Sequence, residues 1–124
     1  SDYIERVQAE LATLPPDANI AQAVVDQAVL EDIRAALRTQ EKHVARAYLF
    51  QRVLESDPAV KDFVLGVETS FLTMGGKGPE VIKDLCDQRF PFPVFIVDLR
   101  TTPYNEFKKH IKRLKIAPFY PGGN

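Results

Sequence analysis

The sequence is poor in several residue types that mark specialised classes of protein. Its 124 residues include one cysteine, one methionine, two histidines and no tryptophan. A single cysteine excludes a scaffold held by intramolecular disulfides. No apolar run approaches the roughly 20 residues that a membrane-spanning helix needs, and the first residues lack the basic and apolar segments of a signal peptide. These absences predict a cytoplasmic protein with no membrane partner.

The charge of the chain is balanced overall but uneven along its length. Sixteen Lys and Arg stand against seventeen Asp and Glu, and 45% of the residues are hydrophobic. This composition and length indicate one folded domain rather than a disordered chain. From residue 100 onward there are six basic residues and one acidic residue, so this end carries +5 and residues 1–99 carry −6. A basic end can bind an anionic partner, and the simpler alternative is a solvated helix face.

Apolar residues at helical spacing predict four helices, over residues 2–14, 26–40, 79–88 and 102–114. Pro15 ends the first helix, because proline constrains the residue before it. Thr102 and Pro103 are expected to open the last helix as its N-cap and first residue.

Alternating apolar residues predict strands over residues 44–53 and 60–69, and a run that is apolar on both faces predicts a third strand over residues 92–99. The first two are close enough in sequence to pair as a hairpin. Residues 20–25 are ambiguous, because their apolar side chains suit either a short strand or the beginning of the following helix.

With residues 20–25 as a strand, the order is β-α-β-β-α-β, which is typical of a ferredoxin-like fold. The predicted class is α+β: an antiparallel sheet with two helices on one face, an added N-terminal helix and a basic C-terminal helix. Residues 1–19 form the N-terminal helix and linker, and residues 20–124 form the domain. Tyr48 and Phe50 point to the second face of the sheet. We expect the terminal helices, or a second subunit in a homodimer, to cover them.

No motif for catalysis or cofactor binding stands out. The glycine-rich segment at residues 75–79 lacks the Gly-Lys-Ser/Thr of a P-loop, so it predicts a mobile loop. Cys86 is expected on the inward side of its helix, together with Val81, Ile82 and Leu85, as a small apolar residue. His43 and His110 have no Cys, Asp or Glu at ligand spacing, which argues against zinc.

Carboxylate pairs are expected only on exposed positions, at Glu31/Asp32, Glu55/Asp57 and Asp84/Asp87. General acid–base catalysis needs a recessed pair with separated pKa values. The sequence therefore predicts no catalytic residue, no cofactor and no metal, and the protein is not expected to be an enzyme.

Nucleic-acid binding is the next possibility, because a basic helix can follow phosphates and four-stranded domains of this order include RNA-recognition domains. Those domains need aromatic residues on the open face of a particular strand. Here the equivalent strand carries Asp62 and Glu68, which would repel phosphates. A nucleic-acid partner is not expected.

Five short segments together resemble the C-terminal domain of the SseB family of bacteria, the enhanced serine sensitivity proteins. They are Val-Ala-Arg-Ala-Tyr-Leu at 44–49, Leu-Gly-Val-Glu at 65–68, the helix at 81–85, Val-Asp-Leu at 97–99 and Pro-Phe-Tyr at 118–120. The resemblance covers residues 20–120. It implies a non-enzymatic bacterial domain of undefined molecular role, commonly preceded by another domain, with a phenotype in serine metabolism.

The leading hypothesis is a module that binds a protein partner. Aromatic residues beside arginines are favoured at the centres of interfaces. The proposed surface combines one face of the sheet with the basic helix, through Arg46, Tyr48, Phe50, Arg52, Lys108, Lys109, Lys112 and Arg113. The alternative is that Tyr48 and Phe50 lie under a terminal helix and serve only the core. Two other functions stay open: an amino-acid-sensing domain, and a small enzyme that uses Cys86 or a carboxylate pair.

Overall fold

A computed structural model describes residues 2–73 and 77–122 of the chain. Its helices are α1 (Asp2–Leu11), α2 (Gln27–Arg38), α3 (Gly78–Cys86) and α4 (Phe107–Leu114). Its strands are β1 (Ile20–Gln22), β2 (Val44–Val53), β3 (Lys61–Thr69) and β4 (Val94–Asp98). The described helices are all too short to cross a membrane.

The ends of the elements differ from prediction where prolines and tight turns intervene. The ambiguous segment is a strand, β1, and α2 begins only after Asp26. The first helix ends at Leu11, three residues earlier than predicted. The last helix begins at Phe107 instead of residue 102, because a 3₁₀ turn at Tyr104–Glu106 comes first. Such tighter turns are frequent at helix N-termini.

The four strands form one mixed sheet in the order β1-β2-β3-β4. β1 and β2 pair antiparallel, and the predicted hairpin of β2 and β3 is confirmed. β4 is parallel to β3, with α3 as the crossover between them. The α+β class is therefore confirmed, while the prediction of an entirely antiparallel sheet is wrong at β4. Neighbouring strands also follow the order of the chain, so neither strand-helix-strand unit is split by a third strand as in the ferredoxin-like arrangement.

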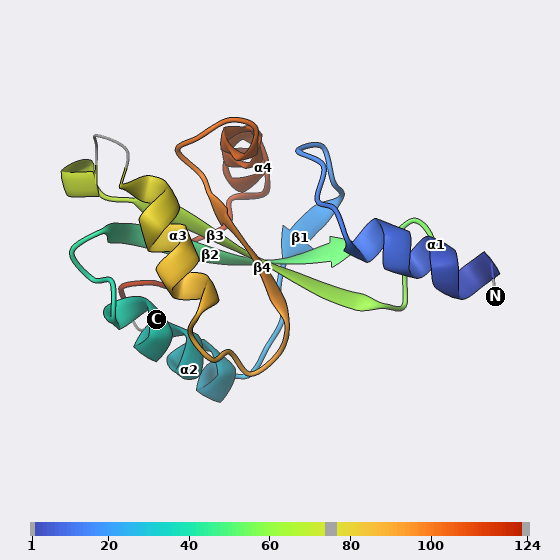
Figure 1. Ribbon diagram of the computed structural model, residues 1–124, viewed down its shortest axis with the longest axis horizontal. Helices are drawn as coiled ribbons and strands as arrows, with labels where there is room; N and C mark the ends of the chain where they lie inside the picture. The colour runs from blue at the N-terminus through green and yellow to red at the C-terminus, as the bar shows by residue number, and fades with distance from the viewer. Residues whose placement is uncertain (1, 74–76, 123–124) are drawn as a thin grey trace.

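Apolar clusters cover both faces of the sheet. α2 and α3 pack on one face around Leu49, Leu65 and Ile96 (Figure 1). On the other face, Phe107 of α4 is fully buried and meets the ring of Phe50 edge-on at 6.0 Å. The prediction that a terminal helix covers this second face is confirmed for α4. α1 has no buried residue and lies at the end of the molecule beside the β2–β3 turn.

The C-terminal segment completes the outer side of β2. The Phe119 N–H donates to the Ala47 carbonyl at 3.0 Å, and the Ala47 N–H donates to the Tyr120 carbonyl at 3.4 Å. β1 pairs with a different stretch of the same side of β2. As a result, β2 has neighbours on both sides, and β4 is the edge strand at the opposite side of the sheet.

Candidate functional site

Four of the residues predicted to form the interaction surface share one face of β2, but only one of them is open to solvent. The Arg46 side chain is 52% exposed. In contrast, Tyr48 is 8% exposed and Phe50 is fully buried, and their rings stack with centroids 6.2 Å apart. Phe50 packs against Phe107 of α4. The prediction of an open aromatic surface is therefore wrong, because α4 covers it, and these rings belong to the core.

Arg52, the fourth of these residues, is also buried. Its guanidinium donates to the Thr13 carbonyl at 2.6 Å and lies 3.5 Å from Asp62 and 4.0 Å from Glu10. Its side chain is only 3% exposed. Arg52 therefore holds the segment after α1 to the sheet and is not part of an accessible surface.

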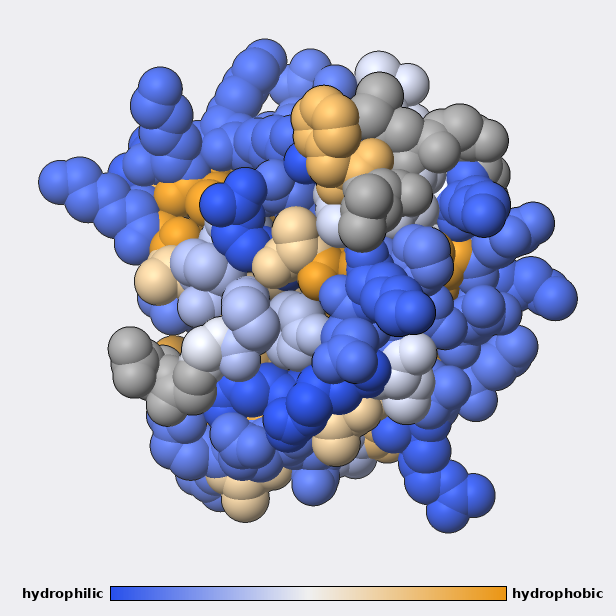
Figure 2. Space-filling model, turned by 90° about the vertical axis from the view of Figure 1, so that its left-hand side faces the viewer, coloured by the Kyte–Doolittle hydropathy of each residue, from blue (hydrophilic) through white to orange (hydrophobic). Residues whose placement is uncertain are grey.

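Around Arg46, at the other end of β2, the fold assembles a group of charges that we call the basic cluster: Arg46, Arg100 and Lys108 around Glu68. The Arg46 guanidinium donates to both carboxylate oxygens of Glu68, at 2.6 and 3.3 Å. Arg100 lies 3.8 Å from the same carboxylate and donates to the Thr69 carbonyl at 2.5 Å. This end of the sheet faces the viewer in Figure 2, where hydrophilic residues dominate and hydrophobic ones form only separate small areas.

The electrostatics of the basic cluster favour the ionised form of Glu68. Burial alone would raise the pKa of its carboxyl group, but the hydrogen bond from Arg46 and the charges of Arg46, Lys108 and Arg100 outweigh it and lower the pKa. The hydrogen bond to Glu68 likewise raises the pKa of Arg46. Two arginines thus contact one carboxylate that is 12% exposed, and the charge of Lys108 acts on it as well. The excess of two positive charges, on side chains that reach solvent, can attract an anionic group.

The rest of the predicted basic helix faces elsewhere. Lys109, Lys112 and Arg113 are exposed; Lys109 pairs with Glu106 at 2.8 Å, and Arg113 lies 2.9 Å from His110 Nδ1. A hollow of about 570 Å³ is lined by Pro16, Asp17, Glu106, Lys109, His110 and Arg113. The structure therefore divides the predicted surface: Lys108 joins the basic cluster, and Lys109 and Arg113 line this separate hollow.

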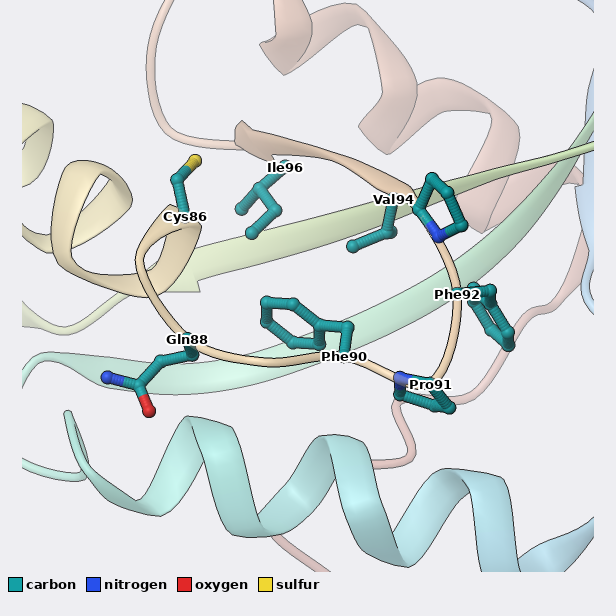
Figure 3. Close-up of a pocket in the computed structure, with 8 residues that line it drawn as sticks. Cys86, Gln88, Phe90, Pro91, Phe92, Val94 and Ile96 are labelled. Atoms are coloured by element: carbon teal, nitrogen blue, oxygen red, sulfur yellow. The ribbon is translucent and has the colours of Figure 1, made fainter.

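Cys86 is exposed, so the prediction that it faces inward is wrong. The buried stripe of α3 consists of Val81 and Leu85, and the next residue after Leu85 is turned away from it. Cys86 borders a largely apolar hollow of about 510 Å³ beside β4 (Figure 3). Although the residue is exposed, partial desolvation of its thiol and the charge of Asp87 raise the pKa of the thiol, which disfavours the reactive thiolate.

Two other sequence predictions concern metal and phosphate. Within residues 2–73 and 77–122, no group of three or more His, Cys, Asp or Glu residues is placed to hold a metal ion. His43 instead lies with its Nδ1 3.1 Å from the hydroxyl of Thr73. The glycine-rich segment at 75–79 falls partly outside the described residues, so its predicted mobility stays a prediction.

Sequence reasoning missed two members of the cluster, Glu68 and Arg100. The sequence pattern indicates only that Glu68 would repel phosphates and that Arg100 contributes to the positive charge of the C-terminal end. The signal that identifies them is the strand register, in which Glu68 lies opposite Arg46 and Arg100 follows a strand parallel to β3. Neither register is visible in the local sequence pattern.

Comparison of the chain with models of known protein families, with curated proteins and with solved structures gives no match.

Proposed function

We propose that the chain is a protein-binding module whose basic cluster binds an acidic segment of a partner. The observation that carries this proposal is that Arg46 and Arg100, from separate parts of the chain, lie 2.6 and 3.8 Å from the single carboxylate of Glu68, with the charge of Lys108 acting on the same carboxylate. The chain as a whole has a formal net charge of −1. A local excess of two positive charges on such a protein is a feature that the fold creates.

The geometry suits carboxylates in particular. Two of the three cations are arginines, each with five N–H donors. Arg46 gives Nε and Nη2 to Glu68 and Arg100 gives Nε to the Thr69 carbonyl, so a partner carboxylate would meet their remaining donors. Charges at the rim of an interface act mainly on the rate and specificity of association. The resemblance to the SseB C-terminal domain implies a non-enzymatic domain of undefined molecular role, and a protein-binding function is compatible with it.

A selection from a phage-displayed library of random dodecapeptides tests the proposal. We expect the selected peptides to contain more Asp and Glu than the starting library. Their affinity, measured as synthetic fluorescent peptides by polarisation, should fall at least about tenfold in the double variant Arg46→Gln/Lys108→Gln, because two charge-assisted contacts are lost. It should also fall as ionic strength rises.

The matched control is Arg6→Gln/Lys83→Gln, which removes the same two residue types from exposed positions on α1 and α3. This variant should bind the peptides with unchanged affinity. Equal loss in both variants, or selected peptides without acidic enrichment, would contradict the proposal. So would tighter binding of a single-stranded oligonucleotide, which would identify the cluster as a nucleic-acid site.

A second candidate, the sensing of amino acids, is favoured by the hollow beside α4. Its lining carries both cations, Lys109 and Arg113, and carboxylates, Asp17 and Glu106. A free amino acid carries the two complementary charges. A thermal-shift screen with the twenty amino acids tests this candidate, since a ligand specific for the folded state raises the melting temperature with its concentration.

A further inference from the structure

β4 presents main-chain hydrogen-bonding groups along its outer edge. The Leu99 N–H donates to the Val67 carbonyl at 2.8 Å, and β4 is in parallel register with β3. In a strand, neighbouring residues direct these groups to opposite sides. Phe95 and Val97 therefore bond to β3, whereas the N–H and C=O of Val94 and Ile96 point away from the sheet. Within the described ranges, no strand pairs with this edge.

Natural sheets usually protect such edges with short strands, charges or a covering segment. The opposite edge strand, β1, has only three residues, and the segment at 119–120 covers more of β2 on that side. β4 has five residues, and its sequence is apolar up to Asp98. Pro93 precedes the strand, and a proline there blocks no outward group of Val94 or Ile96.

The apolar hollow next to Cys86 lies directly against this edge. The chain between α3 and β4 curves around it, and the side chains of Phe90, Val94 and Ile96 point into the enclosed space (Figure 3). Gln88 points away from it. The volume of about 510 Å³ is sufficient for one or two apolar side chains of a ligand.

The edge leads from this hollow to the basic cluster. Val94, the first residue of β4, lines the hollow, and Arg100 follows the last residue, Asp98, by two positions. Five residues at about 3.3 Å each give the strand a length of roughly 16 Å. An extended peptide along β4 would therefore meet an apolar site near one end and arginines near the other.

We propose that β4 binds an extended segment of a partner protein as an added strand, with an apolar side chain in the hollow and carboxylates at the basic cluster. This inference rests on the proposed function and adds the binding mode and the peptide pattern to it. Strand addition supplies affinity through main-chain bonds, and the adjoining side-chain sites supply specificity.

Charge complementarity favours a partner protein over a second copy of this chain. The β4 strand of a second copy carries one carboxylate, that of Asp98. This carboxylate is buried and already bonded to the Arg100 N–H and the Thr69 hydroxyl, at 2.9 and 3.4 Å. Strand-to-strand pairing with a second copy would therefore offer the cluster no free carboxylate from β4.

The variant Val94→Pro tests the added strand, because proline removes an outward N–H and obstructs pairing at the edge. We expect the selected acidic peptides to bind it at least about tenfold more weakly than the original chain. Val94→Ala is the matched control: it shortens the same side chain but keeps the N–H, so it should bind severalfold more tightly than Val94→Pro. Equal affinities of the two variants would overturn the inference.

Val94 is partly buried in the core, so a second measurement uses the unaltered chain. Amide hydrogen exchange, followed by NMR, should slow at Ile96 when the peptide binds. The Val97 amide, which bonds to β3, serves as the internal reference and should be protected with and without peptide. Unchanged exchange at Ile96 in the peptide-bound protein would overturn the strand addition.

The outcomes separate this inference from the proposed function. Peptides that depend on Arg46 and Lys108, but leave Ile96 exchange unchanged, would overturn the added strand and keep the acidic-partner proposal. Selected peptides without enrichment in Asp and Glu would overturn both the acidic-partner proposal and the added strand. A concentration-dependent dimer that protects Ile96 without peptide would replace the partner by a second copy of the chain.

Discussion

The hairpin of β2 and β3 carries an arginine–carboxylate pair at each end, and the two pairs differ in almost every physical property. Arg46 lies opposite Glu68, and Arg52 lies opposite Asp62. Arg46 is 52% exposed and 2.6 Å from its carboxylate, whereas Arg52 is 3% exposed and 3.5 Å from its own. All four side chains lie on the same face of the sheet, so their sequence pattern is the same.

What covers each pair accounts for the difference. Residues 13–19 and the end of α1 close over Arg52, which meets the Thr13 carbonyl and Glu10 there. At Asp62, burial raises the pKa despite the nearby arginine, whereas at Glu68 the surrounding cations outweigh burial and lower it. The same pair of groups is thus a buried structural contact where the chain covers it and an accessible charged surface where the chain leaves it open.

The largest expected effect comes from removing the covered arginine. Arg52→Met leaves the Asp62 carboxylate and the Thr13 carbonyl without their donor in a buried place. Breaking a buried ion pair in this way costs about 3 kcal/mol of unfolding free energy, the lower end of the usual range because Asp62 keeps 18% exposure. Urea unfolding followed by circular dichroism measures the loss.

Arg46→Met is the control for this prediction, since it removes the same group from the open end of the same strand. An exposed pair contributes at most about 1 kcal/mol. Equal losses for Arg46→Met and Arg52→Met would refute the view that coverage distinguishes the two ends.

An intermediate effect is expected at Gly66, which lies on β3 between the two carboxylates. A Cβ there would stand 2.8 Å from Phe50 Cε2 and 3.2 Å from both Cδ atoms of Leu99. Both neighbours are fully buried, so Gly66→Ala should cost about 2 kcal/mol through overpacking. Gly122→Ala, where the added Cβ meets nothing within 4 Å, should be nearly neutral in the same unfolding measurement. An unchanged free energy of unfolding in Gly66→Ala would show that Phe50 and Leu99 can move aside for the added methyl group.

The smallest effect is in the pH dependence of stability, and its sign should be opposite at the two ends. The lowered pKa of Glu68 gives stability that is present above its ordinary value of 4.5 and lost as the pH falls through the shifted pKa. The raised pKa of Asp62 gives stability that is present below its ordinary value of 3.8 and lost as the pH rises through the shifted pKa.

Urea midpoints measured between about pH 3 and pH 6 test this difference. Glu68→Gln should make the loss of stability on acidification shallower, and Asp62→Asn should make it steeper. A change of the same sign in both variants would mean that the two carboxylates have equivalent surroundings.

The sequence predicted the local features of this comparison and the covering of the second face by a terminal helix, but not which positions of β2 remain exposed. The alternation along residues 44–53 placed Arg46, Tyr48, Phe50 and Arg52 on one face, which the structure confirms. Whether each of these positions is exposed depends on its contacts with α4 and with residues 13–19. These segments are distant from β2 in sequence, so the alternation within β2 does not indicate where they pack. The parallel pairing of β4 depends in the same way on how α3 crosses the sheet. The sequence pattern puts Cys86 on the wrong side of α3. Cys86 comes one residue after the buried Leu85, and each residue along a helix rotates the side chain by about 100°.

The bridge between Ala47 and Tyr120 has a consequence for the order in which the chain becomes structured. Its partners are 73 positions apart, and the buried Arg34 finds its acceptor, the Phe119 carbonyl, in the same late segment at 2.7 Å. During synthesis on a ribosome, both contacts must wait until residues 119–120 have emerged. Contacts of such long separation make folding slow, and the nascent domain reaches its final form only after this late segment is available for pairing.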